Sequence, residues 1–195
     1  LDFINISGRT EYYEICCSIA ENLLEEKKWH NIDSSHSSIF YSDIEKNYTY
    51  NGAALVSSFL YRMNQIETNS KWIEKANNLI NFIIDEQNLD GSWYYSIEMK
   101  EKKDKTTIDN RHTGYILEHL AIINSISPTA MLKQKIDKGS EYYIDNLFDE
   151  DKPKWSPYQT YPIDIHDVAQ AIITLLEIEE PLRAQSILNF SIEKM

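Results

Sequence analysis

The stretch Gln87-Asn-Leu-Asp90-Gly91-Ser-Trp93 decides the fold, because its skeleton occurs three times along the chain. An apolar pair, Phe82-Ile83, precedes it at the end of a stretch with helical periodicity. The other two copies are Leu23-Leu24 followed by Trp29, and Tyr143-Ile144 followed by Trp155. Both the apolar pairs and the tryptophans recur at a period of roughly 60 residues, which indicates stacked supersecondary units. Such a unit has room for two helices and a long loop.

Hydrophobic periodicity predicts helices of two kinds. Three are apolar nearly all round, at 51–63, 113–126 and 167–179. Four are amphipathic, at 10–28, 70–86, 129–147 and 181–195. Since the first kind is buried and the second faces water, their alternation predicts inner helices ringed by outer helices. The expected fold is all-α, an α/α toroid or partial toroid of about three helical hairpins in a single domain, residues 1–195.

Helix starts are predicted from polar residues that precede apolar periodicity. Thr10 and Asn51 are the expected N-caps of the first two helices, and the fourth helix begins near Asp109 or Thr113. Because so few hairpins do not close a ring, we expect the domain to be a fragment of a longer toroid. Its open edge would expose apolar flanks, which more chain or an oligomeric partner would cover.

The bulk properties exclude several classes of partner. A formal net charge of −12 argues against nucleic acid and anionic membrane surfaces. No apolar run approaches the roughly 20 residues that span a bilayer, and no signal peptide opens the sequence. Cys16 and Cys17 are adjacent and are expected to be reduced core thiols. These features predict a cytoplasmic protein.

Polar side chains gather where each long loop meets an inner helix. The loops at 31–50, 87–107 and 149–165 all run from an outer helix to an inner one, so they open on the same face. The residues expected at this toroid mouth are Tyr48, Tyr50 and Asn51, then Asp109, Asn110, Arg111, His112 and Tyr115, then Tyr161, Asp164, His166 and Asp167. N-capping alone would explain an acidic residue at such a position, above all Asp167. Three clusters on one face, with histidines and tyrosines, favour a functional cleft instead.

Gln87-x-x-x-Gly91-x-Trp93 after Phe82-Ile83 resembles the QW repeat of squalene and oxidosqualene cyclases. In that family the repeat is structural: the glutamine caps helix ends and the tryptophan stacks in the outer layer. Lys138-Gly139 with Tyr143-Ile144 resembles the opening half of a second copy. The cyclases' Asp-x-Asp-Asp acid motif is replaced here by Asp164-Ile-His-Asp167, which argues against isoprenoid cyclisation.

Asp90-Gly-Ser-Trp93 also resembles the Asp-Gly-x-Trp loops of carbohydrate-active α/α toroids. These include glucuronyl C5-epimerases, unsaturated glucuronyl hydrolases and toroidal pectate lyases. The resemblance implies aromatic side chains that stack on sugars, and Asp, His, Tyr or Arg groups that transfer protons. It therefore favours an enzyme that processes a polysaccharide or oligosaccharide as a hydrolase, lyase or epimerase.

On that interpretation the residues take separate roles. Asp109 and Asp164 form an acid/base pair, His112 and His166 are alternative proton shuttles, and Asp167 is a further catalytic candidate. Arg111 holds a uronate carboxylate. The predicted substrate-binding residues besides Arg111 are Tyr50, Asp90, Trp93, Tyr94, Tyr115 and Tyr161.

Other functions remain open at this point. An isoprenoid cyclase or prenyltransferase-like protein is one alternative, and a non-catalytic toroid that binds a glycan or a protein is another. Asp164, His166 and Asp167 are all metal-ligand types, but their spacing is too general to predict a metal site. We expect no cofactor, and a carbohydrate as the ligand.

Overall fold

The computed structural model describes residues 1–40, 42, 44 and 47–195. Its long helices are α2 (Tyr13–Leu23), α3 (Tyr50–Ile66), α4 (Ser70–Asp85), α6 (Asn110–Ile126), α7 (Ala130–Asn146), α8 (Ile165–Glu177) and α9 (Pro181–Lys194). Its short helices are α1 (Asp2–Ser7), α5 (Ile97–Glu101), η1 (Thr10–Tyr12), η2 (Glu26–Lys28) and η3 (Lys105–Thr107). Two antiparallel hairpins complete the fold, β1 (Trp29–Asn31) with β2 (Ser37–Ile39), and β3 (Phe148–Asp149) with β4 (Lys152–Pro153).

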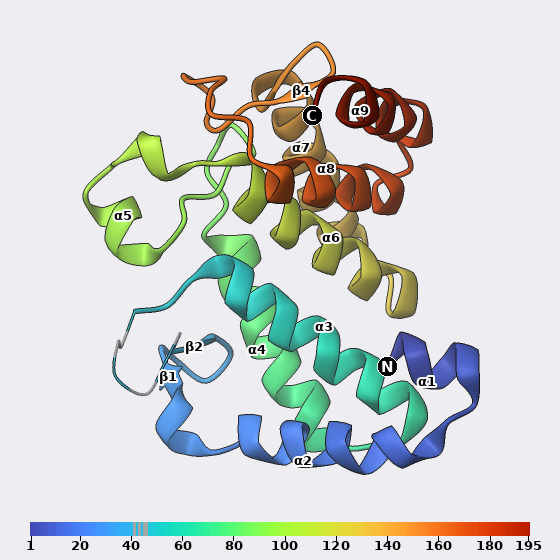
Figure 1. Ribbon diagram of the computed structural model, residues 1–195. Helices are drawn as coiled ribbons and strands as arrows, with labels where there is room; N and C mark the ends of the chain where they lie inside the picture. The colour runs from blue at the N-terminus through green and yellow to red at the C-terminus, as the bar shows by residue number, and fades with distance from the viewer. Residues whose placement is uncertain (41, 43, 45–46) are drawn as a thin grey trace.

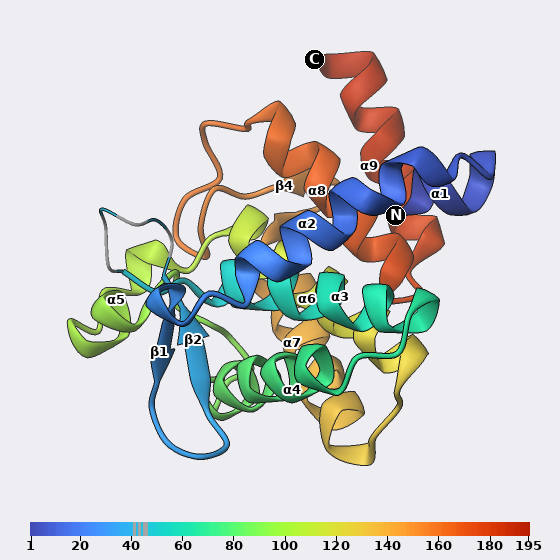
Figure 2. The ribbon, with the colours of Figure 1, turned by 90° about the horizontal axis from the view of Figure 1, so that it is seen from below.

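The long helices form two layers of an arc (Figure 1 and Figure 2). α3, α6 and α8 are the inner helices, and α3 packs on α6 as α6 packs on α8. α2, α4, α7 and α9 are the outer helices, each packed on an inner helix next to it in the sequence. The inner helices α3 and α6 bury residues around most of their circumference, as all-round apolar sequences require. The predicted all-α architecture with inner and outer layers is confirmed.

Side-chain caps define where most of these helices begin. Asn69, Asp109, Thr129 and Asp164 each accept a hydrogen bond from a backbone N–H in the first turn of the helix that follows. The cap at Asp109 was predicted, but other boundaries were wrong. Thr49 rather than Asn51 precedes α3, and α8 begins at Ile165 rather than 167 because Asp164 is its cap.

The predicted first helix, 10–28, is broken into three pieces. Thr10–Tyr12 forms the 3₁₀ turn η1, α2 ends at Leu23, and η2 follows at Glu26–Lys28. Thr10 does not cap α2, since Tyr12 precedes that helix. The Nε1–H of Trp29 donates to the carbonyl of Leu23 at 2.6 Å, which satisfies one of the carbonyls left free at the helix end.

An aromatic side chain beyond each outer helix links that helix to the next outer helix. Trp29 lies under the amine of Lys75 on α4, 4.6 Å from the ring centre. Trp93 is 1% exposed and lies so close to Gly139 of α7 that a Cβ there would approach its ring to 2.7 Å. In the third unit Phe148, rather than Trp155, makes this link, with the guanidinium of Arg183 on α9 placed 5.1 Å from its ring centre.

The loop after α4 is tied to α7 by the side chain of Gln87. The side-chain amide of Gln87 donates to the carbonyls of Gly91 at 3.0 Å and of Lys135 at 2.9 Å. Trp93 Nε1 donates to the carbonyl of Ile83 at 2.9 Å, as Trp29 does to Leu23 in the preceding unit. The Gln-Gly-Trp pattern therefore acts as a structural joint between outer helices.

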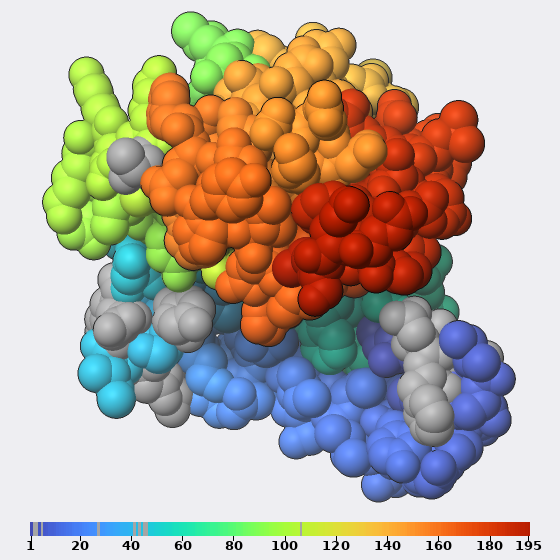
Figure 3. Space-filling view, turned by 45° about the horizontal axis from the view of Figure 1, so that its top comes forward, coloured from blue at the N-terminus to red at the C-terminus, as the bar shows by residue number. Residues whose placement is uncertain are grey.

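The three long loops lie toward one side of the molecule (Figure 1 and Figure 3). In the space-filling view the segment around α5 (lime) lies beside the loop that precedes α8 (orange). The loops are more ordered than predicted: the first contains β2, the second contains α5 and η3, and the third contains β4. The inner-helix N-termini open on this face, which is the toroid mouth.

The far side of α8 is an open apolar edge. Ile173 and Leu176 are 45% and 54% exposed. Counted from the helix caps, they correspond to Ser58 and Tyr61 of α3, which are buried. In the described part of the chain no further inner helix covers this stripe.

None of the helices in the described part of the chain combines the length and apolar composition needed to cross a membrane.

Replacing Gly91 by alanine tests the joint between α4 and α7. Gly91 has φ +95°, and an added Cβ would lie 2.3 Å from the Lys138 carbonyl oxygen on α7. We expect Gly91→Ala to lower the free energy of unfolding by about 3 kcal/mol, from backbone strain plus displacement of a backbone atom. Urea denaturation measures the change.

Gly8→Ala is the matched control. Gly8 also has positive φ, +67°, but nothing lies within 4 Å of an added Cβ. It should cost only about 1 kcal/mol, the conformational penalty alone. Equal losses for the two variants would contradict a tight approach of the loop to α7.

Candidate functional site

Asp109 caps α6 and also positions the side chain of His112 in the first turn of that helix. Its Oδ1 accepts from the backbone N–H of His112 at 2.8 Å, and its Oδ2 lies 2.7 Å from His112 Nδ1. A carboxylate accepts only, so it favours the imidazole tautomer with the proton on Nδ1. The Nε2 lone pair of a neutral His112 is thereby left available to accept a proton.

Asp164 repeats this arrangement at the start of α8. Its Oδ1 accepts from the His166 backbone N–H at 2.8 Å and lies 2.9 Å from His166 Nδ1. The backbone N–H of His166 is the main cause that lowers the pKa of Asp164 below its usual value. The two histidines differ in enclosure, because the side chain of His112 is 26% exposed and that of His166 is 74% exposed. His112 is therefore the better-placed proton carrier.

Arg111 connects the two inner helices. Its Nη1 lies 4.0 Å from Asp164 Oδ2, and its Nε lies 3.7 Å from Asp167 Oδ1. Asp164 on α8 is thus an ion-pair partner of Arg111, and the contact of Arg111 with a uronate carboxylate stays a prediction. The position of Arg111 brings the cap regions of α6 and α8 together.

Asp167 is the most perturbed carboxyl group of the site. Its side chain is 4% exposed at the third position of α8, and burial raises its pKa to about 6. Arg111 and His112 oppose that rise, while Asp164 and Asp109 add to it. All four groups are therefore within electrostatic range of Asp167. The competing explanation of Asp167 as an N-cap is excluded, because Asp164 caps the helix.

Two further residues support this cluster: Asn110, which was expected at the toroid mouth, and Tyr95, which the sequence did not single out. Tyr95 packs on His112, with ring centres 4.5 Å apart. The buried amide of Asn110 donates to the Leu147 carbonyl at 2.7 Å and accepts from the Tyr143 hydroxyl at 2.8 Å. These contacts fix the first turn of α6 against the end of α7. We call Asp109, Arg111, His112, Asp164 and Asp167 the mouth cluster.

Three predicted sugar-stacking or binding residues belong to the core instead. Trp93 and Tyr94 are buried where the loop meets α7, and Tyr50 is fully buried at the start of α3. A ring without an exposed face cannot stack on a sugar, so these assignments are corrected. Tyr50 still matters for position, since its hydroxyl donates to Glu86 Oε2 at 2.8 Å.

The remaining predicted binding residues make contacts outside the mouth cluster. Asp90 Oδ1 accepts from the backbone N–H and the hydroxyl of Ser92, so it closes its own turn. Tyr115 is partly buried on α6 with its ring parallel to that of His119, 6.5 Å away. Tyr161 is exposed in the loop before α8. The assignment of these three residues to substrate binding therefore stays a prediction.

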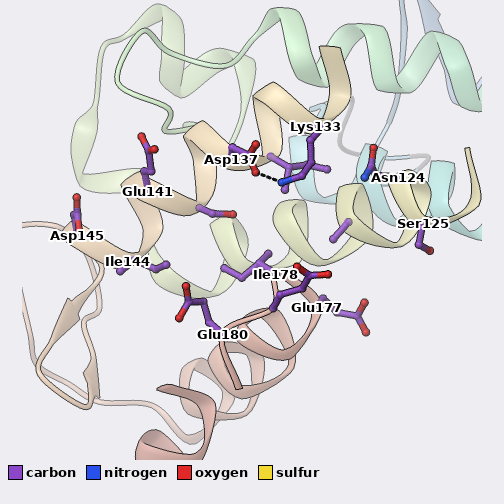
Figure 4. A pocket seen from close by; sticks show the side chains of 14 residues that line it. Asn124, Ser125, Lys133, Asp137, Glu141, Ile144, Asp145, Glu177, Ile178 and Glu180 are labelled. Atoms are coloured by element: carbon purple, nitrogen blue, oxygen red, sulfur yellow. Dashed lines mark hydrogen bonds and ion pairs between the residues drawn. The ribbon is translucent and has the colours of Figure 1, made fainter. Parts of the chain in front are cut away.

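A hollow of about 640 Å³ lies between α7 and the turn from α8 to α9 (Figure 4). Its rim carries acidic side chains from both sides, including Glu141, Asp145 and Glu180. It reaches Asn124 near the end of α6, about 22 Å along that helix from Asp109 at 1.5 Å per residue. This acidic groove is therefore separate from the mouth.

The described residues contain no group of three or more His, Cys, Asp or Glu side chains arranged to hold a metal ion. Asp164, His166 and Asp167 accordingly do not form such a group. What the mouth cluster offers chemically is a buried carboxyl group whose pKa is raised to about 6, within electrostatic range of an imidazole oriented by a carboxylate. That pairing is suited to general acid and general base catalysis.

Comparison with solved structures identifies the architecture. A GH76 α-mannanase of Bacteroides thetaiotaomicron superposes with a TM-score of 0.73 over 95% of this chain, at 11% identity. A polysaccharide lyase superposes with a TM-score of 0.60 over 98% of the chain, at 14% identity. The chain has an α/α-toroid fold. It spans 56% and 58% of the length of those two proteins. No protein-family model matches the sequence, and neither does any curated protein.

The raised pKa of Asp167 predicts how stability depends on pH. Its folded-state value of about 6 exceeds the unfolded value of about 3.9, so ionisation destabilises the fold as pH rises between these values. Asp167→Asn removes that titration. Relative to wild type, this variant should gain about 2 kcal/mol in unfolding free energy between pH 4 and pH 7.

Urea denaturation at the two pH values measures this gain, with Asp137→Asn as the control. Asp137 is an exposed carboxylate on α7, in the groove away from the mouth. The control should show little pH-dependent difference from wild type. A gain as small for Asp167→Asn as for the control would contradict the perturbed titration.

Proposed function

We propose that this chain is part of an oligosaccharide- or polysaccharide-processing enzyme, and that its mouth cluster hydrolyses a glycosidic bond. The observation that carries the proposal is the pairing of Asp167, buried with a raised pKa, with the Asp109–His112 pair on the neighbouring helix. Acid/base cleavage requires, at the same pH, one group that carries a proton to donate and one that can accept a proton. The α/α-toroid neighbours, named as an α-mannanase and a polysaccharide lyase, support the carbohydrate class.

In the proposed reaction Asp167 acts as the general acid. Its carboxyl proton passes to the glycosidic oxygen as the bond from that oxygen to the anomeric carbon breaks. Arg111, whose Nε lies 3.7 Å from Asp167 Oδ1, stabilises the carboxylate that remains. Burial makes the protonated form available at a pH where an ordinary aspartate is ionised.

His112 acts as the general base. Its Nε2 takes a proton from water while the water oxygen bonds to the anomeric carbon, and Asp109 stabilises the imidazolium through Nδ1–H. One water is consumed and one glycosidic bond is cleaved. The proton on His112 then returns through solvent to Asp167, which restores both groups.

The state of Arg111 favours hydrolysis over elimination. A lyase that removes the proton next to a uronate carboxylate must neutralise that carboxylate with a cation. Arg111 Nη1 already lies 4.0 Å from Asp164, a carboxylate whose pKa is lowered in part by Arg111 itself. Among the described residues, the ion pairs that join the mouth cluster to a lysine or arginine all involve Arg111. Within the mouth cluster, a uronate would therefore meet no cation that lacks a carboxylate partner.

Asp167→Asn tests the general acid. Asparagine keeps the shape but cannot donate a carboxyl proton, so turnover should fall by about 10²- to 10⁴-fold. In wild type the rate should decline as pH rises through about 6, because the acid must be protonated. Reducing-end release from a panel of polysaccharides between pH 4 and pH 8 measures both effects, with Asp137→Asn as the control. Unchanged turnover in Asp167→Asn would overturn the role.

Asp109→Asn separates chemistry from helix capping. Asparagine caps a helix about as well as aspartate, so the fold should be retained. It removes the charge beside His112 Nδ1 and permits the wrong tautomer, so turnover should fall by about 10²-fold or more. The same assay, together with urea denaturation, gives the two quantities. Glycan binding by wild type without any product formation would show a binding domain rather than an enzyme.

A further inference from the structure

A cavity of about 500 Å³ lies beside the mouth cluster, between the first β-hairpin, α4 and α5. Phe82 and Ile97 contribute apolar lining. His30 and Tyr48 also line it, as a stacked pair with ring centres 4.9 Å apart and planes within 17° of parallel. The cavity thus combines aromatic and aliphatic surface, the setting in which ligand sites are usually built.

The cavity is adjacent to the proposed acid and base groups through one short segment. Tyr95 packs on His112, Ser96 forms a β-bridge with Thr49, and Ile97 lines the cavity. The backbone at Ser96 is extended, so Tyr95 and Ile97 are about 7 Å apart at 3.3 Å per residue. One oligosaccharide bound across this segment can therefore reach both places.

The polar lining of the cavity is acidic. Glu86, Glu98 and Glu101 contribute carboxylates, and no lysine or arginine is among its described lining residues. Glu86 is held in place by the Tyr50 hydroxyl at 2.8 Å and by Lys100 Nζ at 2.9 Å. Glu98 pairs with Lys102, four residues further along the chain. The positive charges of Lys100 and Lys102 are thus already paired with Glu86 and Glu98.

We propose that this cavity is a subsite for an uncharged sugar unit, and that the substrate is an uncharged glycan rather than a polyuronate. Sugar hydroxyls donate hydrogen bonds to carboxylates, and the C–H face of a pyranose packs on aromatic rings. A uronate would meet the three carboxylates here and would find Arg111 already paired with the carboxylate of Asp164 at the cleavage site. The inference rests on the proposed glycan-processing function and names its substrate class.

The test is isothermal titration calorimetry of the whole chain with defined hexasaccharides. The uncharged probes are mannohexaose, cellohexaose and maltohexaose, and the charged probe is hexagalacturonate. We expect at least one uncharged probe to bind and hexagalacturonate to bind at least tenfold more weakly. Tight binding of hexagalacturonate, or no binding of any uncharged probe, overturns the proposal.

The double variant Glu98→Gln/Glu101→Gln tests whether the glycan binds in this cavity. Both side chains are exposed on α5, so the change alters charge without disturbing the core. The affinity for the uncharged probe should fall about tenfold, because charge-assisted hydrogen bonds become neutral ones. Glu14→Gln/Glu21→Gln, an equal change at exposed positions on α2, should bind as wild type does.

Turnover of Asp167→Asn distinguishes failure of the subsite proposal from failure of the proposed glycan-processing function. If the α5 variant keeps wild-type affinity while Asp167→Asn still loses turnover, the cavity is not a subsite and the enzyme proposal stands. If no glycan is bound or cleaved by wild type, both proposals fail. A tenfold loss of affinity in the α5 variant, with hexagalacturonate bound weakly, supports the subsite.

Discussion

The contact between Trp93 and Gly139 is the constraint on which the rest of the structure depends. The indole N–H donates to the Ile83 carbonyl near the end of α4, while the ring occupies space on α7 that any Cβ would fill. This one side chain therefore fixes the distance between two outer helices and the direction in which the loop leaves the first. Trp29 and Phe148 make related links on either side. The inner helices follow this spacing, and their N-termini meet on one face.

That geometry explains why the residues that cap the inner helices lie beside those of the proposed chemistry. Asp109 and Asp164 are N-caps, and the groups two and three residues beyond them are Arg111, His112, His166 and Asp167. Side chains at the start of neighbouring inner helices converge at the mouth without any long excursion of the chain. The cost falls on stability, because Asp167 is buried among other carboxylates and its ionised form is disfavoured. Such strain between stability and activity is common at catalytic sites.

The architecture could be predicted from the sequence because its signals are local. Helical periodicity, the recurring apolar pair with its tryptophan and the Asp109 cap can each be read within a short window. The roles of aromatic residues could not be predicted in the same way. Trp93 and Tyr50 are as consistent with a sugar platform as with a core position, since loop sequence carries no period that reports burial.

The grouping of residues in the candidate site was predicted in part, while their roles stay predictions. The capped acids and histidines were found because they precede apolar helices, but the partner of Arg111 was not. Arg111 meets Asp164 and Asp167, which are distant from it in the sequence, through packing of α6 on α8. Glu86 and Tyr95 carried no motif, and only the fold places them beside the mouth. Non-local pairing is the information that single-sequence patterns lack.

The most direct measurement is the pKa of Asp167 in the folded protein, from the pH titration of its side-chain carboxyl ¹³C NMR signal. Loss of that signal in Asp167→Asn assigns it. The account predicts a midpoint of about 6, set by burial within the mouth cluster. A midpoint near 4, the value of an ordinary exposed aspartate, would contradict the claim that this carboxyl group holds its proton for catalysis.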